Sequence, residues 1–131
     1  MSRFFDTNLL IYAQQEGAKA DAARQLMAEG GIISVQVINE FTAVSLRKLG
    51  RSWPEIEAAL RDILAVMEPP LPVTPETSAT ARDLAAAHDL SFYDALIIAA
   101  ALEAGCTTLL TENMQSGRRF GDLTITNPFT G

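Results

Sequence analysis

The chain has 131 residues, of which 48% are hydrophobic and 20% are charged. These values are typical of a compact globular protein, and they exclude a disordered chain or one that needs disulfides to fold. No apolar run approaches the roughly 18 residues of a membrane span, and no apolar leader precedes Asp6. We therefore expect a cytoplasmic protein with no membrane partner, in which the single cysteine, Cys106, is a buried thiol.

The formal net charge of −6 counts against a nucleic-acid ligand, because evenly spread negative charge repels a polyanion. Two basic clusters remain available for local phosphate contacts, namely Arg47/Lys48/Arg51 and Arg118/Arg119. Bound cations would also neutralise some of the carboxylates. The overall charge therefore neither supports nor excludes an enzyme that acts on RNA.

Short apolar runs alternate with helical patterns along the chain, which predicts an α/β fold around a mostly parallel sheet. The predicted strands are residues 2–5, 31–34, 71–74, 106–110 and 123–126. Capping and stop signals predict helices that begin near Asn8 and after Ser34, Ser52, Thr74 and Ser91, the last four ending near Leu49, Pro69, His88 and Gly105. Because no repeat or linker divides the chain, we predict one domain over residues 1–131, a three-layer α/β/α sandwich with about five strands.

Asp6 and Asp94 stand at junctions between predicted elements. Asp6 follows strand 2–5, and ligands of open α/β folds bind at the carboxyl ends of parallel strands. Asp94 opens a helix on the same arc as Ile97 and Ile98. The simpler interpretation is structural, with Asp6 capping a helix and Asp94 complementing a helix dipole. For Asp94 the two roles are compatible, because a carboxylate at a helix start can also hold a cation.

Glu40 lies on a helical arc that is otherwise apolar and includes Val37, Phe41 and Val44. A carboxylate there is costly unless it is paired or bound to metal. The alternatives are a head group that reaches past the sheet edge or one that meets an arginine. A further polar segment, residues 111–113, follows strand 106–110, and a plain turn explains it as well as a ligand site does.

Several carboxylates at one sheet edge would repel one another, by about 4 kcal/mol for a pair ~4 Å apart at an effective dielectric of 20. A hard divalent cation offsets this repulsion, and Mg²⁺ or Mn²⁺ prefers oxygen ligands. Zinc would want His and Cys ligands, which the chain supplies only as His88, expected on the surface, and Cys106. Such a site suits phosphodiester hydrolysis by a metal-activated water without a side-chain nucleophile.

Five segments carry a family resemblance: Phe-Asp-Thr-Asn at 5–8, Ile-Asn-Glu-Phe at 38–41, Ser-Phe-Tyr-Asp-Ala-Leu-Ile at 91–97, Leu-Leu-Thr-Glu-Asn-Met-Gln at 109–115 and Asn-Pro-Phe at 127–129. In this order the chain resembles the PIN-domain family, and within it the VapC-type toxins of toxin–antitoxin pairs. The resemblance implies a PIN-like sandwich and a Mg²⁺- or Mn²⁺-dependent endoribonuclease that cuts single-stranded or loop RNA, often tRNA or rRNA. It also implies an inhibiting antitoxin and a homodimer.

By this resemblance, Asp6, Glu40 and Asp94 match the family's three principal acidic positions. Asp6 and Asp94 would ligate the metal directly, and Glu40 would ligate it or orient a water. Thr7 and Asn8 would hold Asp6 in place by hydrogen bonds. The resemblance therefore implies a metal site made of Asp6, Glu40 and Asp94.

The chain departs from the family pattern at the fourth acidic position, where related sequences commonly carry Asp and this chain has Asn113. Asn113 would offer a carbonyl contact there, or Glu112 would turn inward instead, and Thr111 would hydrogen-bond across the cleft. With one carboxylate fewer, we expect one firmly held ion in the free protein rather than two.

Three rival interpretations make different demands on the sequence. A haloacid-dehalogenase-like phosphatase needs a second acid two residues after the first, where Asn8 stands. A receiver-type signalling domain needs an adjacent acidic pair and a suitable lysine, and the only lysines are Lys19 and Lys48. A catalytically degenerate PIN domain that acts as an interaction module stays open because of Asn113. Metal-stimulated RNA cleavage would separate that last alternative from the enzyme.

Overall fold

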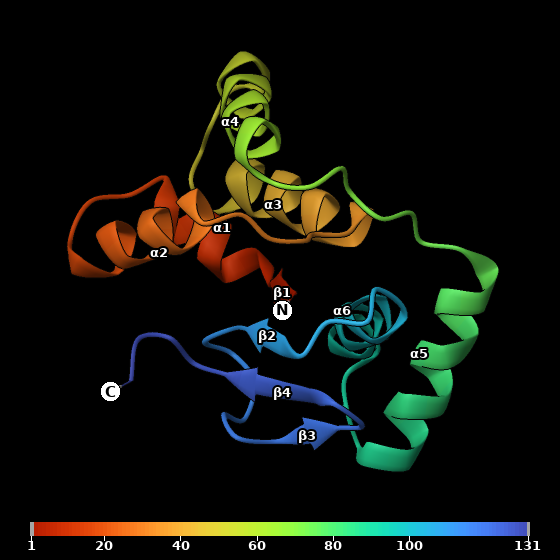
Figure 1. The fold of residues 1–131 in the computed structure, drawn as a ribbon. Helices are drawn as coiled ribbons and strands as arrows, with labels where there is room; N and C mark the ends of the chain where they lie inside the picture. Colours follow the sequence, from red (N-terminus) through yellow and green to blue (C-terminus); the bar gives the residue numbers. More distant parts are fainter. Residues whose placement is uncertain (1, 131) are drawn as a thin grey trace.

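The computed structural model describes residues 2–130 and arranges them as a three-layer α/β/α fold, as predicted (Figure 1). Helices α1 to α4 lie together on one side of the molecule, and α5 and α6 lie on the other (Figure 1). In chain order the described elements are β1 (Arg3–Phe5), α1 (Thr7–Ala13), α2 (Ala18–Ala28), α3 (Val35–Arg47), α4 (Trp53–Val66), α5 (Pro75–His88), α6 (Phe92–Glu103), β2 (Thr108–Leu110), β3 (Arg119–Phe120) and β4 (Leu123–Thr126).

The sheet within these residues is mixed and has the order β1-β2-β4-β3. The β1–β2 and β2–β4 pairs are parallel, and β3, which was not predicted, pairs antiparallel with β4. The predicted strands 31–34 and 71–74 form only single parallel bridges, Phe4 to Ile32 and Ser34 to Leu71. The first segment stays short because α3 starts directly after Ser34, and the second because α5 starts directly after Thr74. The sheet therefore has four regular strands rather than about five.

Helix starts follow the predicted capping signals. Ser34, Thr74 and Ser91 each accept a hydrogen bond from the backbone of the first helical turn, and Ser52 forms a reciprocal capping box with Glu55. Helix α2 was not predicted. Its buried stripe is made of Ala20, Ala23 and Met27, and Gly17 provides no side-chain cap, so neither a strong apolar pattern nor a start signal marks it.

The core lies between the sheet and both helical layers. Phe4, Phe5 and Leu109 are fully buried, and burial of such side chains contributes about 1.5–3 kcal/mol each. Helix α6 is buried from Ala95 to Ala101 and packs against α5 and α3. Its first turn, with Phe92, Tyr93 and Asp94, is accessible to solvent, as are Leu102 and Glu103 at its other end. The packing therefore places Asp94 at the open end of a buried helix.

In the described part of the chain, no single helix is both long and apolar enough to span a membrane. Helices α5 and α6 reach the required length and composition only as a pair, and the two are bent by 118° at their junction.

Candidate active site in an acidic cleft

A cleft of about 890 Å³ brings together the four predicted site residues, Asp6, Glu40, Asp94 and Asn113. Asp6 follows β1, Asn113 lies in the loop after β2, Glu40 belongs to α3, and Asp94 lies in the first turn of α6. Because β1 and β2 are parallel neighbours, their carboxyl ends open on the same edge of the sheet. The predicted convergence of these side chains is therefore found in the structure.

Asp6 is buried and held by several hydrogen bonds. Its carboxylate accepts from the backbone N–H of Thr7 at 2.7 Å and from the hydroxyl of Thr111 at 2.8 Å, while the Asn8 amide is more distant at 3.4 Å. Asp6 thus caps α1 as well as lining the cleft. Burial raises the pKa of Asp6 to about 6, the hydrogen bonds from Thr7 and Thr111 oppose the rise, and the charges of Glu40 and Asp94 add to it.

Glu40 is tied to the Asp6 segment by Thr7. The Thr7 hydroxyl donates to Oε1 of Glu40 at 2.7 Å, and the Gln36 amide lies 3.4 Å from Oε2. The expectation that Thr7 would hold Asp6 by a hydrogen bond is met through the Thr7 backbone N–H, while the Thr7 hydroxyl binds Glu40. Thr7 therefore connects the two carboxylates through one hydrogen bond to each.

Asp94 combines its capping position with a place in the cleft. Its backbone N–H donates to the Ser91 hydroxyl at 3.2 Å, so the residue belongs to the first turn that Ser91 caps. Within residues 2–130, the ion pairs are Arg3–Glu29, Lys19–Glu112 and Arg24–Asp21. No Lys or Arg of this described part is therefore paired with any of the three cleft carboxylates.

The donors of the cleft suit a divalent cation that keeps part of its water shell. Among the described residues, no three His, Cys, Asp or Glu side chains converge closely enough to hold an ion by themselves. Mg²⁺ usually binds through one or two carboxylates and retains several waters. A buried Asp6 with two more carboxylates close enough to raise its pKa supplies that kind of donor set, so the residues fit such an ion.

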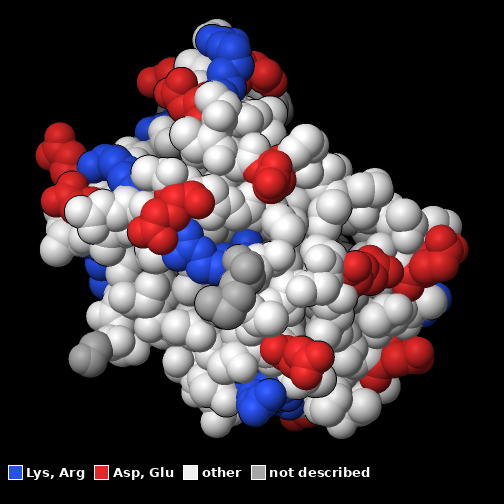
Figure 2. Space-filling view, in the orientation of Figure 1, with Lys and Arg blue, Asp and Glu red and all other residues white. Residues whose placement is uncertain are grey.

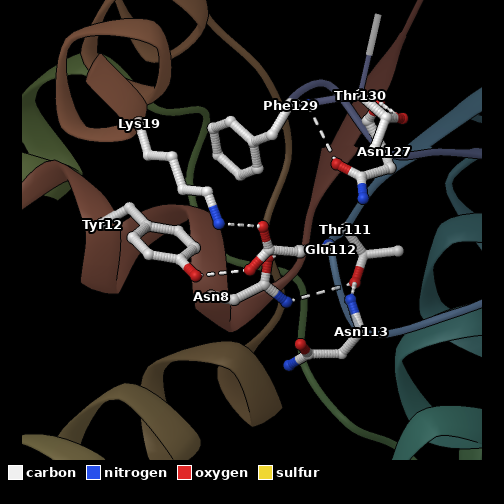
Figure 3. A network of polar contacts seen from close by, with 9 residues as sticks. All are labelled: Asn8, Tyr12, Lys19, Thr111, Glu112, Asn113, Asn127, Phe129 and Thr130. Atoms are coloured by element: carbon white, nitrogen blue, oxygen red, sulfur yellow. Dashed lines mark hydrogen bonds and ion pairs between the residues drawn. The ribbon is translucent and has the colours of Figure 1, made fainter.

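The fourth polar position is occupied by Asn113 and not by Glu112. Asn113 lines the cleft, and its backbone N–H donates to the Thr111 hydroxyl at 3.1 Å. Glu112 turns the other way, where its carboxylate accepts from the Tyr12 hydroxyl and lies 2.5 Å from Nζ of Lys19 (Figure 3). These two partners lower the pKa of Glu112. The alternative in which Glu112 serves in the cleft is therefore wrong for this structure.

An aromatic and ionic cluster holds the loop after β2 against α1 and the C-terminal segment (Figure 3). The Phe129 ring packs edge-on against Tyr12 with centroids 5.2 Å apart, and Nζ of Lys19 lies 5.6 Å from the Phe129 centroid. The backbone N–H of Glu112 donates to Oδ1 of Asn8 at 3.0 Å. The cluster therefore fixes the loop from which Asn113 projects.

Truncation of Phe129 tests this cluster. We expect Phe129→Ala to lower the free energy of unfolding by about 1–2 kcal/mol, because it removes a partly buried ring and one aromatic pair. Urea denaturation followed by circular dichroism measures the change. Trp53→Ala is the matched control, since Trp53 is 58% exposed and its loss should stay within about 0.5 kcal/mol. Equal losses in the two variants would contradict a structural role for the cluster.

One of the two basic clusters flanks the cleft. Arg47 and Lys48, at the end of α3, line it. Arg118 instead donates to the backbone carbonyl of His88 at 2.9 Å and lies over the Phe120 ring. On the face drawn in Figure 2, basic side chains lie beside acidic ones in several places, so charge of both signs is spread over this face. The negative net charge is thus compatible with a local basic rim at the cleft.

Some residues that line the cleft were not among the predicted site residues. Gln36, Asn39 and Tyr93 also line the cleft. Gln36 lies one helical turn before Glu40, which is the only sequence signal that could have found it. The expectations for two other residues are confirmed, because Cys106 is buried and His88 is exposed outside the cleft.

Fold and site together define a class: a small α/β/α protein with clustered carboxylates at the carboxyl ends of its parallel strands. A family model for the PIN domain matches residues 3–118. The chain belongs to the PIN-domain family. Comparison with curated protein sequences gave no match.

Solved structures share the fold at low sequence identity. A toxin–antitoxin complex from Klebsiella pneumoniae contains a chain that is 20% identical, with a TM-score of 0.74 and coverage of 98% of both chains. VapBC2 from Rickettsia felis, bound to a promoter DNA fragment, is 21% identical, with a TM-score of 0.71 and coverage of 97% of this chain and 98% of the other. The sarcin–ricin loop cleaving toxin VapC20 of Mycobacterium tuberculosis is 22% identical, with a TM-score of 0.64 and coverage of 82% and 87%.

Proposed function

We propose that this protein is a metal-dependent endoribonuclease and the toxin of a VapBC-type toxin–antitoxin module. The observation that carries the proposal is the cleft in which buried Asp6 faces Glu40 and Asp94, with Arg47 and Lys48 on the rim. Family membership supports it, since PIN-domain nucleases generally use a divalent metal. The similar structures support the toxin role, because two of them come from toxin–antitoxin pairs and one is a toxin that cleaves the sarcin–ricin loop.

In this proposal Asp6 and Asp94 hold the Mg²⁺ or Mn²⁺ ion, and Glu40 ligates it or orients the attacking water. When bound, such an ion lowers the pKa of a water and offsets charge on the leaving oxygen. Thr7 fixes Glu40 through its hydroxyl and Asp6 through its backbone N–H, which preorganises the carboxylates.

The remaining side chains of the cleft bind substrate. Asn113 offers its side-chain carbonyl, and Arg47 and Lys48 contact RNA phosphates. No residue of the chain need form a covalent intermediate, because the nucleophile is water.

The proposal extends to partners. The substrate is an RNA such as tRNA or rRNA, the regulator is a cognate antitoxin protein, and the active form is a homodimer in the cytoplasm. One PIN domain over residues 1–131 carries all of these functions.

A catalytically degenerate PIN domain that serves as an interaction module is the second candidate. Asn113 in place of a fourth acid favours it, as does the lack of three converging ligand side chains among the described residues. The two candidates predict opposite results in a cleavage assay.

The deciding experiment incubates a pool of structured RNAs with purified protein in Mn²⁺ or Mg²⁺ and, in parallel, in EDTA. We expect cleavage only with metal. Asp122→Asn is the control variant, because Asp122 is an exposed acid outside the cleft and should cut at the wild-type rate. Metal-independent cutting would indicate a contaminating nuclease, and metal binding without cutting of any RNA would favour the interaction module.

A further inference from the structure

Tyr93 is the most exposed of the large hydrophobic side chains in the described residues, at 61%. It stands directly before Asp94, and both residues line the acidic cleft. Its ring meets Phe92 edge-on at a centroid distance of 5.7 Å and an angle of 61°. Most of the Tyr93 side chain nevertheless stays open to solvent.

The exposure of Tyr93 is not explained by the stability of α6. The helix start is capped by Ser91, and the buried face begins at Ala95. Within residues 2–130 no hydrogen bond holds the Tyr93 hydroxyl in place. Single exposed apolar side chains are common on protein surfaces, but this one lies at the rim of a cleft whose other lining residues are largely polar or charged.

The rim of the same cleft carries the groups that bind a polynucleotide backbone. Arg47 and Lys48 supply positive charge from the C-terminal end of α3, and Gln36 and Asn39 supply amides from its N-terminal half, next to Glu40. Proteins that bind single-stranded RNA combine a basic track for the phosphates with aromatic rings on which unpaired bases stack. A base inside a duplex has no free face to offer to such a ring.

We propose that the Tyr93 ring stacks on an unpaired nucleobase beside the phosphate that the cleft holds, while Arg47 and Lys48 contact the backbone. This inference rests on the proposed ribonuclease function and adds a substrate-binding residue to it. Tyr93 thereby selects RNA whose bases are unpaired next to the reacting phosphate. The ring and not the hydroxyl makes the contact.

A fluorescence titration tests the stacking without any turnover. The protein carries Asp6→Asn to slow cleavage, Trp53→Phe to remove the only tryptophan of the chain, and Tyr93→Trp as the reporter, and the titration is done in EDTA. Short single-stranded oligoadenylate should quench the emission, and an abasic oligonucleotide with the same number of phosphates should not. Asp6→Asn with Trp53 intact is the control, and its emission should not change, because Trp53 lies outside the cleft.

Kinetics with the active enzyme form the second arm. Tyr93→Ala should raise KM for single-stranded RNA by roughly 5- to 150-fold, the range that corresponds to base–aromatic stacking, with a smaller change in kcat. Tyr93→Phe should keep the wild-type KM because it keeps the ring. Trp53→Ala should do so as well, as an exposed aromatic residue outside the cleft.

The results of these experiments test the stacking role of Tyr93 and the ribonuclease function separately. Equal quenching by the abasic and base-containing oligonucleotides, or a wild-type KM in Tyr93→Ala, overturns the stacking role, while the ribonuclease function stands. A wild-type protein that cleaves no RNA with metal overturns the function. In that case quenching by oligoadenylate alone would still establish Tyr93 as a base-binding residue.

Discussion

Asp6→Asn is expected to reduce RNA cleavage by about 10²- to 10³-fold, the loss typical when one electrostatic element of a preorganised site is removed. The same change should stabilise the metal-free protein. Burial raises the pKa of Asp6 from 3.8 to about 6, so a charged Asp6 costs the folded state at most about 3 kcal/mol. Asparagine keeps an acceptor for the Thr7 N–H but leaves the Thr111 hydroxyl without its carboxylate, and we expect a net gain of about 1–2 kcal/mol.

The stabilisation expected from Asp6→Asn should depend on pH. Between pH 3.8 and about 6 the folded protein binds the Asp6 proton more tightly than the unfolded chain does. The loss of folding stability caused by the buried charge of Asp6 is therefore fully present above about pH 6, and it disappears as the pH falls towards 3.8. Urea denaturation in EDTA should show that the stabilisation by Asp6→Asn is smaller at pH 5 than at pH 7.5 by about 1.4 kcal/mol, which removes most of it. An equal stabilisation by Asp6→Asn at both pH values would contradict the raised pKa of Asp6. Asp122→Asn, which changes an exposed acid, serves as the control.

Mg²⁺ or Mn²⁺ is expected to stabilise the protein strongly. At 100 times its dissociation constant, an ion that binds only the folded state adds about 2.7 kcal/mol, or roughly 10 °C in melting temperature for a chain of this size. The physical reason is that the cation offsets the charge of buried Asp6 and of its neighbours Glu40 and Asp94. Asp94→Asn should remove much of this gain. Thermal unfolding with and without metal measures it.

Calorimetric titration of the free protein should find one tight ion. Asn113 stands where a fourth carboxylate would be, and Glu112 is engaged by Lys19 and Tyr12, so few negative ligands remain for a second ion. Asn113→Asp adds such a ligand and should strengthen metal binding. Two tight sites in the wild-type protein, or no thermal shift with either metal, would contradict the prediction.

The sequence was sufficient to predict features that depend on near neighbours along the chain. Ser34, Ser52, Thr74 and Ser91 start helices where the capping signals placed them, because a cap acts within three or four residues. The strand after which Asp6 stands and the helix that Asp94 opens were recognised in the same way. The rule that parallel strands share a ligand-binding edge placed Asp6 and the segment after β2 together, while the full set of Asp6, Glu40, Asp94 and Asn113 followed from the family resemblance.

Weak local signals account for the elements that the sequence did not reveal. Helix α2 has an alanine-rich buried stripe and no side-chain cap, and β3 has two residues. Segments 31–34 and 71–74 look like strands in composition but form single bridges. In each case packing against the rest of the chain, and not the local pattern, decides the conformation.

Only the tertiary structure decided which partners the site residues choose. The Thr7 hydroxyl binds Glu40 from 33 positions away, Lys19 binds Glu112 across 93, and Thr111 binds Asp6 across 105. Asn113 faces the cleft because Glu112 is drawn to the opposite side by Lys19 and Tyr12. By itself the sequence determined the fold class and the acidic positions, since periodicity and capping are local. It left open the direction in which adjacent polar side chains point, because that depends on contacts that exist only once distant segments have packed together.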